Sequence, residues 1–135
     1  MIKNFLILII LFAGMLSCNN QTEKAPVTDL EVANAFVRNI LDNNFKEAEK
    51  YLLKDETNQQ YFDRFQQQYD AKDKTVLDKY KEAYIIVHET SYVTDTVFIF
   101  NYSNSYMKDA RNKLKLVRIN NKWLVDFKYT FSGNL

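Results

Sequence analysis

RINNKWLVD, residues 118–126, is the stretch that decides the fold of this chain. Asn120-Asn121 near its centre is a two-residue turn signal, because asparagine tolerates the positive φ that tight hairpin turns need. After the turn, apolar residues recur at every second position: Trp123, Val125, Phe127, Tyr129 and Phe131. Period two is the pattern of a strand with one buried face. The stretch therefore predicts an antiparallel hairpin whose last strand covers 123–131.

Three further strands are expected before this turn. β-branched and aromatic residues, which favour strands, dominate from Ala83 onward. We place the strands at about 82–92, 94–102 and 110–119. In the second of them Phe98, Phe100 and Tyr102 share one face, whereas the pattern of the first leaves open which face is buried. On the last strand, Asp126 falls on the face opposite the aromatic set.

The region before the strands predicts helices. Thr28 and Glu31 form a capping box that starts the first helix. Apolar residues at helical spacing give this helix one buried face: Leu30, Ala33, Phe36, Val37, Ile40 and Leu41. Asn43-Asn44 ends it, because asparagine favours turns. A short second helix is expected over about 45–53.

A third helix is expected to begin at Asp55, which is a suitable N-cap. Its apolar face is formed by Tyr61, Phe62, Phe65 and Tyr69. The charged stretch 70–74 ends or bends this helix. Three N-terminal helices followed by four antiparallel strands define an α+β fold, with the helices packed on one face of the sheet.

Composition limits the classes of function. The chain has 135 residues and a net charge of +1, and its lysines and arginines are interspersed with acids. Balanced charge gives no basic surface for nucleic acid, so no nucleic-acid partner is expected. There is a single cysteine, so an intramolecular disulfide is impossible. The folded part must therefore rely on its core.

The N-terminus has the pattern of an export signal. Lys3 precedes an apolar run over 5–16, which is shorter than the roughly 20 residues that span a bilayer. The run ends in Gly14-Met15-Leu16-Ser17-Cys18, which resembles the lipobox of bacterial lipoproteins. That resemblance implies a signal peptide over 1–17, cleavage before Cys18, and attachment of lipid to its thiol and acyl chains such as palmitate to the new N-terminus. Met15 and Leu16 depart from the commonest residues at their positions.

The residues after the lipobox indicate where the protein resides. Residues 18–27 are expected to be a lipidated cysteine followed by a polar tether, and residues 28–135 the folded domain. The resemblance places the protein in the cell envelope, held on the membrane by its lipid. Because Asn19, and not aspartate, follows the cysteine, it favours the outer membrane where the source has two membranes.

The order of elements carries a second resemblance. The helix after Asn43-Asn44, and the turn at Asn120-Asn121 leading into the Trp123 strand, are similar to features of NTF2-like (cystatin-like) domains, and to small lipoproteins of the DUF4878 type. The resemblance covers roughly 28–131, and Asn121 stands where glycine is usual. It implies a curved sheet wrapped into a cone, with a pocket lined from the concave face. Members include isomerase-like and dehydratase-like enzymes and many binding modules.

The sequence contains no convincing catalytic or metal motif, and no cofactor is expected. His88 is the single histidine, and the leader-adjacent Cys18 cannot complete a metal site with it. Candidate ligand-binding residues within such a cone are His88, Phe98, Phe100, Tyr102, Phe127 and Tyr129, with ordinary core packing as the competing interpretation of the aromatic ones. We therefore expect a non-catalytic binding or interaction module for a small apolar ligand or an envelope protein. The alternative is a small enzyme that uses His88 and a tyrosine as acid–base groups.

Overall fold

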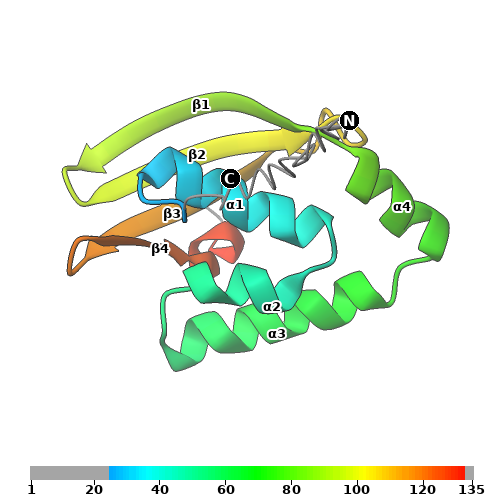
Figure 1. Cartoon of the computed structure of the whole chain (residues 1–135), viewed down its shortest axis with the longest axis horizontal. Helices are drawn as coiled ribbons and strands as arrows, with labels where there is room; N and C mark the ends of the chain where they lie inside the picture. The colour runs from blue at the N-terminus through cyan, green and yellow to red at the C-terminus, as the bar shows by residue number, and fades with distance from the viewer. Residues whose placement is uncertain (1–24, 133–135) are drawn as a thin grey trace, which may run out of the picture.

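The computed structural model describes residues 25–132, so the predicted leader and Cys18 lie outside the described residues. Helices come first along the chain: α1 (Asp29–Leu41), α2 (Phe45–Ala48), the 3₁₀ turn η1 (Glu49–Tyr51), α3 (Glu56–Asp70) and α4 (Lys74–Glu82). The strands follow: β1 (Ile85–Thr94), β2 (Val97–Asn104), β3 (Asn112–Ile119) and β4 (Lys122–Asp126), with a final 3₁₀ helix η2 (Phe127–Phe131). The α+β class is confirmed (Figure 1).

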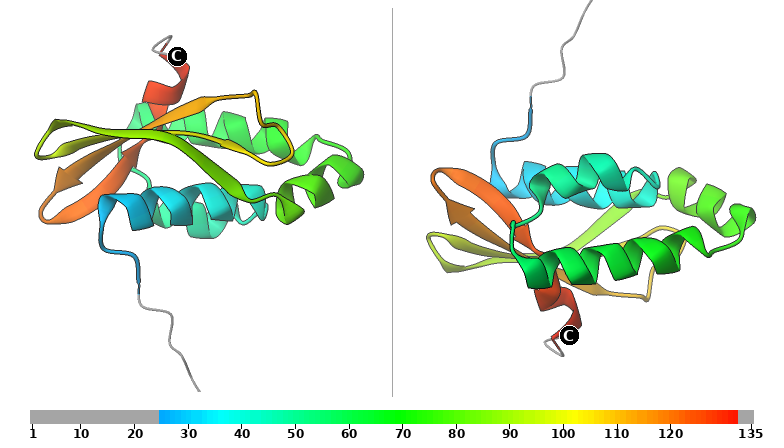
Figure 2. Two further views of the ribbon diagram at one scale, coloured as in Figure 1. Left: turned by 90° about the horizontal axis from the view of Figure 1, so that it is seen from above. Right: turned by 90° about the horizontal axis from the view of Figure 1, so that it is seen from below.

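The sheet is an open antiparallel meander. Its strands are hydrogen-bonded in the order β1-β2-β3-β4, so each strand pairs with the next one along the chain. The sheet is bent, and α1 lies along its inner side in contact with all four strands (Figure 2). We call this helix-covered side the concave face. The row Phe98, Leu116 and Val125 lies on it, and all three side chains are buried.

The local signals at the turns and caps are confirmed. Asn120 and Asn121 have φ of 49° and 62°, as the two-residue hairpin turn requires. Asn43, with φ of 58°, follows the end of α1. At the start of α1 the Glu31 backbone N–H donates to Thr28 Oγ1 at 3.2 Å, and the Thr28 N–H donates to the Glu31 carboxylate at 3.0 Å. These residues therefore set where α1 begins and where the hairpin turns.

One residue of the predicted buried face of α1 is exposed in the structure. Ala33, Phe36, Val37, Ile40 and Leu41 are buried as expected, whereas Leu30 is exposed. Leu30 lies at the margin of the face in the first turn, and the neighbouring Asp29 is buried there by accepting a hydrogen bond from the Tyr92 hydroxyl. The first turn of α1 is therefore attached to β1 by a polar contact.

The last strand is shorter than predicted. β4 ends at Asp126, and the expectation of one strand over 123–131 is wrong from Phe127 onward. Two contacts explain the change. The Lys128 backbone N–H donates to Asn58 Oδ1 at 2.8 Å instead of to a neighbouring strand. The Phe127 ring packs between Phe36 and Phe62, with centroids 5.6 Å away in each case.

Four α-helices precede the sheet, whereas three were predicted. The charged stretch 70–74 breaks the third predicted helix into α3 and α4. A nine-residue helix is marginal by itself. Arg38 of α1 holds the end of α4, because its guanidinium donates to the Ala83 carbonyl at 2.6 Å and to the Lys81 carbonyl at 3.2 Å. A cation at a helix C-terminus is favourable.

Asn58 joins α3 to the end of the sheet. Its side chain is fully buried, and its amide nitrogen donates to Asp55 at 2.7 Å and to Asp126 at 3.2 Å. With its oxygen bonded to Lys128, Asn58 satisfies three polar groups at once. The placement of η2 against α3 therefore depends on one amide.

Replacing this amide tests that dependence. We expect Asn58→Ala to lower the free energy of unfolding by about 2–3 kcal/mol, because the Lys128 N–H and the Asp126 carboxylate lose a buried partner. Urea unfolding of the purified protein measures it. Gln60→Ala, on the exposed side of the same helix, is the matched control and should stay within about 0.5 kcal/mol of wild type. An Asn58→Ala protein as stable as the control would contradict the assignment.

Candidate functional site

A hollow of about 200 Å³ opens at the C-terminal end of α1, between this helix, α3, α4 and the β2–β3 connection. We call it the tyrosine pocket. Its lining is Val37, Ile40, Leu41, Phe65, Tyr69, Lys72, Tyr80, Tyr102, Asn104, Met107, Ala110 and Asn112. Most of these side chains are apolar or aromatic, which is typical of small-molecule sites. The pocket thus combines residues that lie up to 75 positions apart in the sequence.

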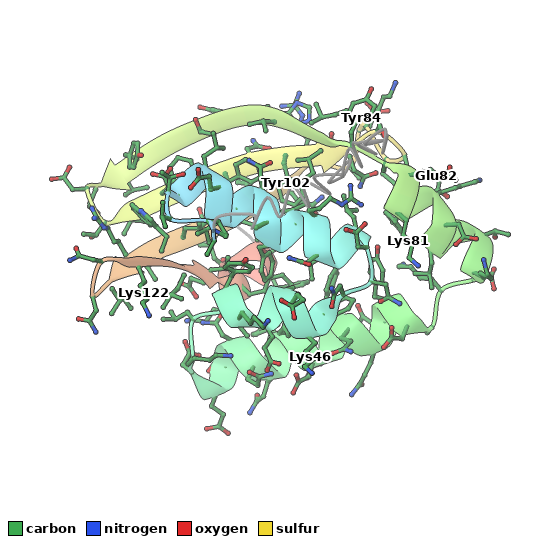
Figure 3. The ribbon with its side chains drawn as sticks, viewed as in Figure 1. Lys46, Lys81, Glu82, Tyr84, Tyr102 and Lys122 are labelled. Carbon is green, nitrogen blue, oxygen red and sulfur yellow. The ribbon has the colours of Figure 1, made fainter. Side chains whose placement is uncertain are left out.

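Three tyrosines from three elements supply half of its polar side chains. Tyr69 of α3 and Tyr80 of α4 have ring centroids 5.4 Å apart, and Tyr102 of β2 stacks on Phe100 at 5.4 Å. Figure 3 labels Tyr102 beside α1. The Tyr69 hydroxyl donates weakly to the Leu41 carbonyl at 3.4 Å. Phe100 therefore supports the pocket from behind, although it does not line it.

The two asparagines of the lining hydrogen-bond to the backbone of the β2–β3 connection. Asn104 Oδ1 accepts hydrogen bonds from the backbone N–H groups of Tyr106 and Met107, both at 3.0 Å. The Asn112 amide donates to the Ala110 carbonyl at 3.0 Å. These bonds fix the β2–β3 connection as one wall of the pocket. The side-chain donors left to meet a ligand are the hydroxyls of Tyr80 and Tyr102 and the Lys72 ammonium.

Burial keeps the tyrosines neutral. It raises the pKa of Tyr69 and Tyr102 well above the usual value for tyrosine. Burial, assisted by the neighbouring Tyr106, also raises the pKa of Tyr80. A neutral phenol donates one hydrogen bond and does not ionise near neutral pH. These hydroxyls are therefore suited to hydrogen-bond a ligand, and poorly suited to acid–base catalysis.

The contact that positions Tyr80 also closes the pocket wall. The Tyr80 ring meets Tyr106 edge to face, with centroids 5.3 Å apart, and the Lys79 ammonium lies 5.2 Å from the Tyr106 ring centroid. α4 is thus tied to the β2–β3 connection on one side and to Arg38 on the other. Sequence reasoning missed this wall, because no local pattern indicates which loop an amphipathic helix will contact.

The predicted ligand-binding residues separate into different places. Tyr102 lines the tyrosine pocket. Phe98 and Phe127 are buried in the core, as the competing interpretation held. Tyr129 lines a shallower hollow beside η2, together with Lys115 and Asp126. The six residues predicted to bind a ligand therefore do not form one site. Some of the aromatic ones lie in the core and others at the surface.

His88 lies apart from the tyrosine pocket. It occupies a bulge in β1, and its Nε2 is 2.8 Å from the hydroxyl of the buried Ser103. Ser103 and Tyr102 are neighbours on β2, so their side chains point to opposite faces of the sheet. The structure thus separates His88 from the Tyr102 hydroxyl by the thickness of the sheet.

An ion cluster forms where β4 ends, outside the tyrosine pocket. The buried Asp126 accepts from Lys128 Nζ at 2.8 Å and Lys115 Nζ at 3.2 Å, and Lys128 also reaches Asp55 at 3.2 Å. Burial alone would raise the pKa of Asp126, but bonds from Lys128, Lys115 and Asn58 hold it below its ordinary value. Sequence reasoning did not bring these groups together. A carboxylate so fully paired stabilises the fold rather than acting as a base.

Comparisons with known proteins give no relative. No family model matches the chain, and the searches of curated proteins and of solved structures return no match. Within residues 25–132, no helix is long and apolar enough to cross a membrane. The same residues contain no group of three or more His, Cys, Asp or Glu side chains placed to hold a metal ion. The tyrosine pocket is therefore the basis for a functional proposal.

The ion cluster predicts acid sensitivity. Since the folded pKa of Asp126 is lowered, its stabilisation is present above the unfolded pKa and is lost as the pH falls through the folded one. We expect the wild-type free energy of unfolding to fall on acidification from about pH 5 to about pH 3, and Asp126→Asn to show a shallower fall. Urea unfolding across this interval measures both. The exposed Asp109→Asn is the control, and equal slopes for Asp126→Asn and wild type would contradict the assignment.

Proposed function

We propose that this chain is a membrane-anchored, non-catalytic binding module that takes a small ligand into the tyrosine pocket. The anchor is a lipid on Cys18, so the protein belongs to the cell envelope, at the outer membrane where the source has two. The observation that carries the ligand-binding part is the presence of three neutral tyrosines in the lining of one apolar hollow. That combination gives affinity through burial and orientation through hydrogen bonds.

The size of the pocket limits the ligand. Apolar protein cavities of about 150 Å³ accept benzene. At about 200 Å³, the tyrosine pocket suits a molecule with one ring or a short aliphatic chain. Among the described residues, the lining holds the cationic Lys72 and no carboxylate. We therefore favour a small apolar body that carries oxygen acceptors, neutral or anionic, over a cation.

The proposed NTF2-like fold agrees with this site. Helices that precede an antiparallel sheet, with α1 laid along its concave face, support the assignment. A pocket between that helix and the end of the sheet is what such a cone would provide. The assignment to this superfamily, and to the small lipoproteins within it, remains a proposal based on element order and the Trp123 hairpin.

Catalysis by His88 and a tyrosine has less support. His88 is bonded to Ser103 on the opposite face of β2 from Tyr102. Burial also raises the pKa of the pocket tyrosines away from neutrality. A general acid–base pair needs two groups that reach one substrate and titrate near the working pH. Binding without turnover therefore fits the geometry better.

Blocking the pocket mouth tests ligand binding. Ala110 lines the pocket and is exposed, so Ala110→Trp should place an indole at the mouth without disturbing the core. Using benzoate as the probe in a ligand-observed NMR titration, we expect wild type to bind and Ala110→Trp to weaken binding by about tenfold or more, equivalent to about 1.4 kcal/mol. Asp109→Trp, next to it and outside the lining, should bind as wild type. Failure of benzoate and of its neutral analogue benzyl alcohol to bind wild type would refute the site.

The lipid anchor has its own test. Cells that produce the full chain and are fed labelled palmitate should incorporate the label into the protein, and Cys18→Ala should abolish incorporation, because the thiol that accepts the lipid is missing. Intact mass of the purified protein should show cleavage before Cys18 together with the added lipid. Asn20→Ala is the control for a change in the same segment. A wild-type protein that carries no lipid would rule out this anchor.

A further inference from the structure

Exposed apolar side chains gather at the end of the domain where α1 begins. Both hairpin turns of the sheet lie at this end (left in Figure 1). Five large apolar side chains there are between 43% and 67% exposed: Val27, Leu30, Tyr92, Val93 and Ile119. They come from the approach to α1 and its first turn, from the end of β1 and from the end of β3. We call this region the tether end. An apolar gathering of this kind marks an interaction surface.

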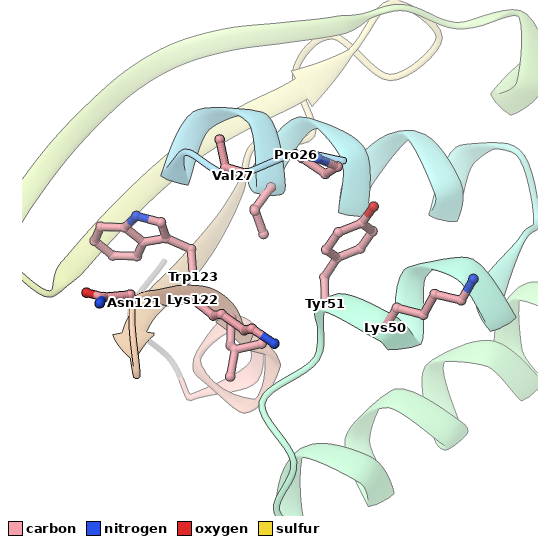
Figure 4. A pocket seen from close by; sticks show the side chains of 9 residues that line it. Pro26, Val27, Lys50, Tyr51, Asn121, Lys122 and Trp123 are labelled. Atoms are coloured by element: carbon pink, nitrogen blue, oxygen red, sulfur yellow. The ribbon is translucent and has the colours of Figure 1, made fainter. Parts of the chain in front are cut away.

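A second hollow lies at the tether end. It measures about 270 Å³, and Pro26, Val27, Tyr51 and Trp123 are among the residues that line it (Figure 4). The cations Lys50 and Lys122 also line it, and among the described residues no carboxylate does. The Lys50 ammonium is ion-paired with Glu47 at 2.6 Å, so Lys122 is the lysine of this lining for which no ion pair is described.

Those residue types are the ones found where proteins meet the surface of a bilayer. Tryptophan and tyrosine concentrate at the headgroup level, because their rings are apolar and carry one polar group. At this end Tyr92 is the exposed ring, whereas Trp123 is only 8% exposed and packs in the core behind the hollow. Lysine extends its charge to the phosphates while its stem stays on apolar surface. Arg118 adds a further cation, 5.9 Å from the Trp123 ring. Asp95 in the β1–β2 turn, and Asp29 and Glu31 in the first turn of α1, are acids at the same end. Apolar contact therefore contributes more here than net charge.

Chain length decides which surface is within reach. Residue 25 is the seventh after Cys18, and seven residues span at most about 25 Å. A lipid on Cys18 thus keeps the tether end close to the bilayer. α1 has 13 residues and is about 20 Å long, with the second hollow at its N-terminal end and the tyrosine pocket at its C-terminal end. The two hollows therefore lie at opposite ends of α1.

From these observations we propose that the tether end docks on the phospholipid headgroup surface, with Val93, Leu30 and the Trp123 hollow against the bilayer. The inference rests on the lipid anchor proposed above, and it fixes the orientation of the domain. The tyrosine pocket then lies at the end of α1 that is farther from the bilayer, so its ligand comes from the aqueous phase and not from the lipid.

Spin labels at the two ends test the orientation. In the lipidated protein, Val93→Cys places a thiol at the β1–β2 turn, and Tyr84→Cys places one at the other end of β1, nine residues or about 30 Å away. Tyr84 is labelled in Figure 3 and is exposed to a similar degree, 63% against 67% for Val93. The protein is bound to vesicles of phosphatidylethanolamine with a minor share of phosphatidylglycerol. We expect the label at 93 to collide with oxygen dissolved in the lipid, and the label at 84 to collide with a water-soluble nickel chelate.

A label-free measurement guards against disturbance by the probe. Trp123 is the single tryptophan of the chain, so quenching of its fluorescence by brominated phospholipids reports docking directly. Val93→Ser should lower the ratio of docked to undocked protein by roughly fivefold to tenfold, because it removes the burial of one valine. Tyr84→Ser should leave the ratio unchanged.

The outcomes separate the two proposals. Lipidated protein whose labels at 93 and 84 are equally exposed to water, with Trp123 unquenched, overturns docking while the anchor stands. A purified protein with no lipid on Cys18 overturns the anchor and docking together. Quenching that is equal for Val93→Ser and Tyr84→Ser would also overturn the assignment of the tether end as the docking surface.

Discussion

The packing of α1 along the concave face of the sheet is the constraint on which the rest of the structure depends. The helix contacts all four strands, and its buried face supplies Phe36 to the aromatic core. Through Arg38 it also holds the end of α4, which carries Tyr80 to the tyrosine pocket. Because the rigid helix α1 runs from the tether end of the domain to the tyrosine pocket, the distance between these two places is fixed.

Much of the fold follows from local chemistry that the sequence displays. Asparagine at 120 and 121 permits a turn that few residues adopt, and Thr28 with Glu31 starts a helix wherever they fall. The errors lie where tertiary contacts replace local preference. Alternation in 123–131 predicts one long strand, yet Asn58, 70 positions away, takes the backbone N–H of Lys128. A period of two cannot reveal a partner on a distant helix.

The site was less predictable than the fold. Parity correctly grouped Phe98, Phe100 and Tyr102 on one face, but burial along that face is graded: the inner rings fill the core and Tyr102, at the end, meets the pocket. The sequence pattern places Tyr69 on the apolar face of a helix, and the structure agrees. A helix pattern does not distinguish a core tyrosine from one that lines a pocket. His88 was uncertain because a bulge breaks the alternation of β1.

The central claim is that the end of α1 leaves an open hollow among Val37, Phe65 and Tyr102. A crystal of the protein placed under xenon gas tests this most directly, because xenon enters apolar cavities that side chains leave empty. The account predicts a xenon site within the tyrosine pocket of wild-type protein. Side chains that fill this space, with no xenon bound between α1 and the β2–β3 connection, would contradict it.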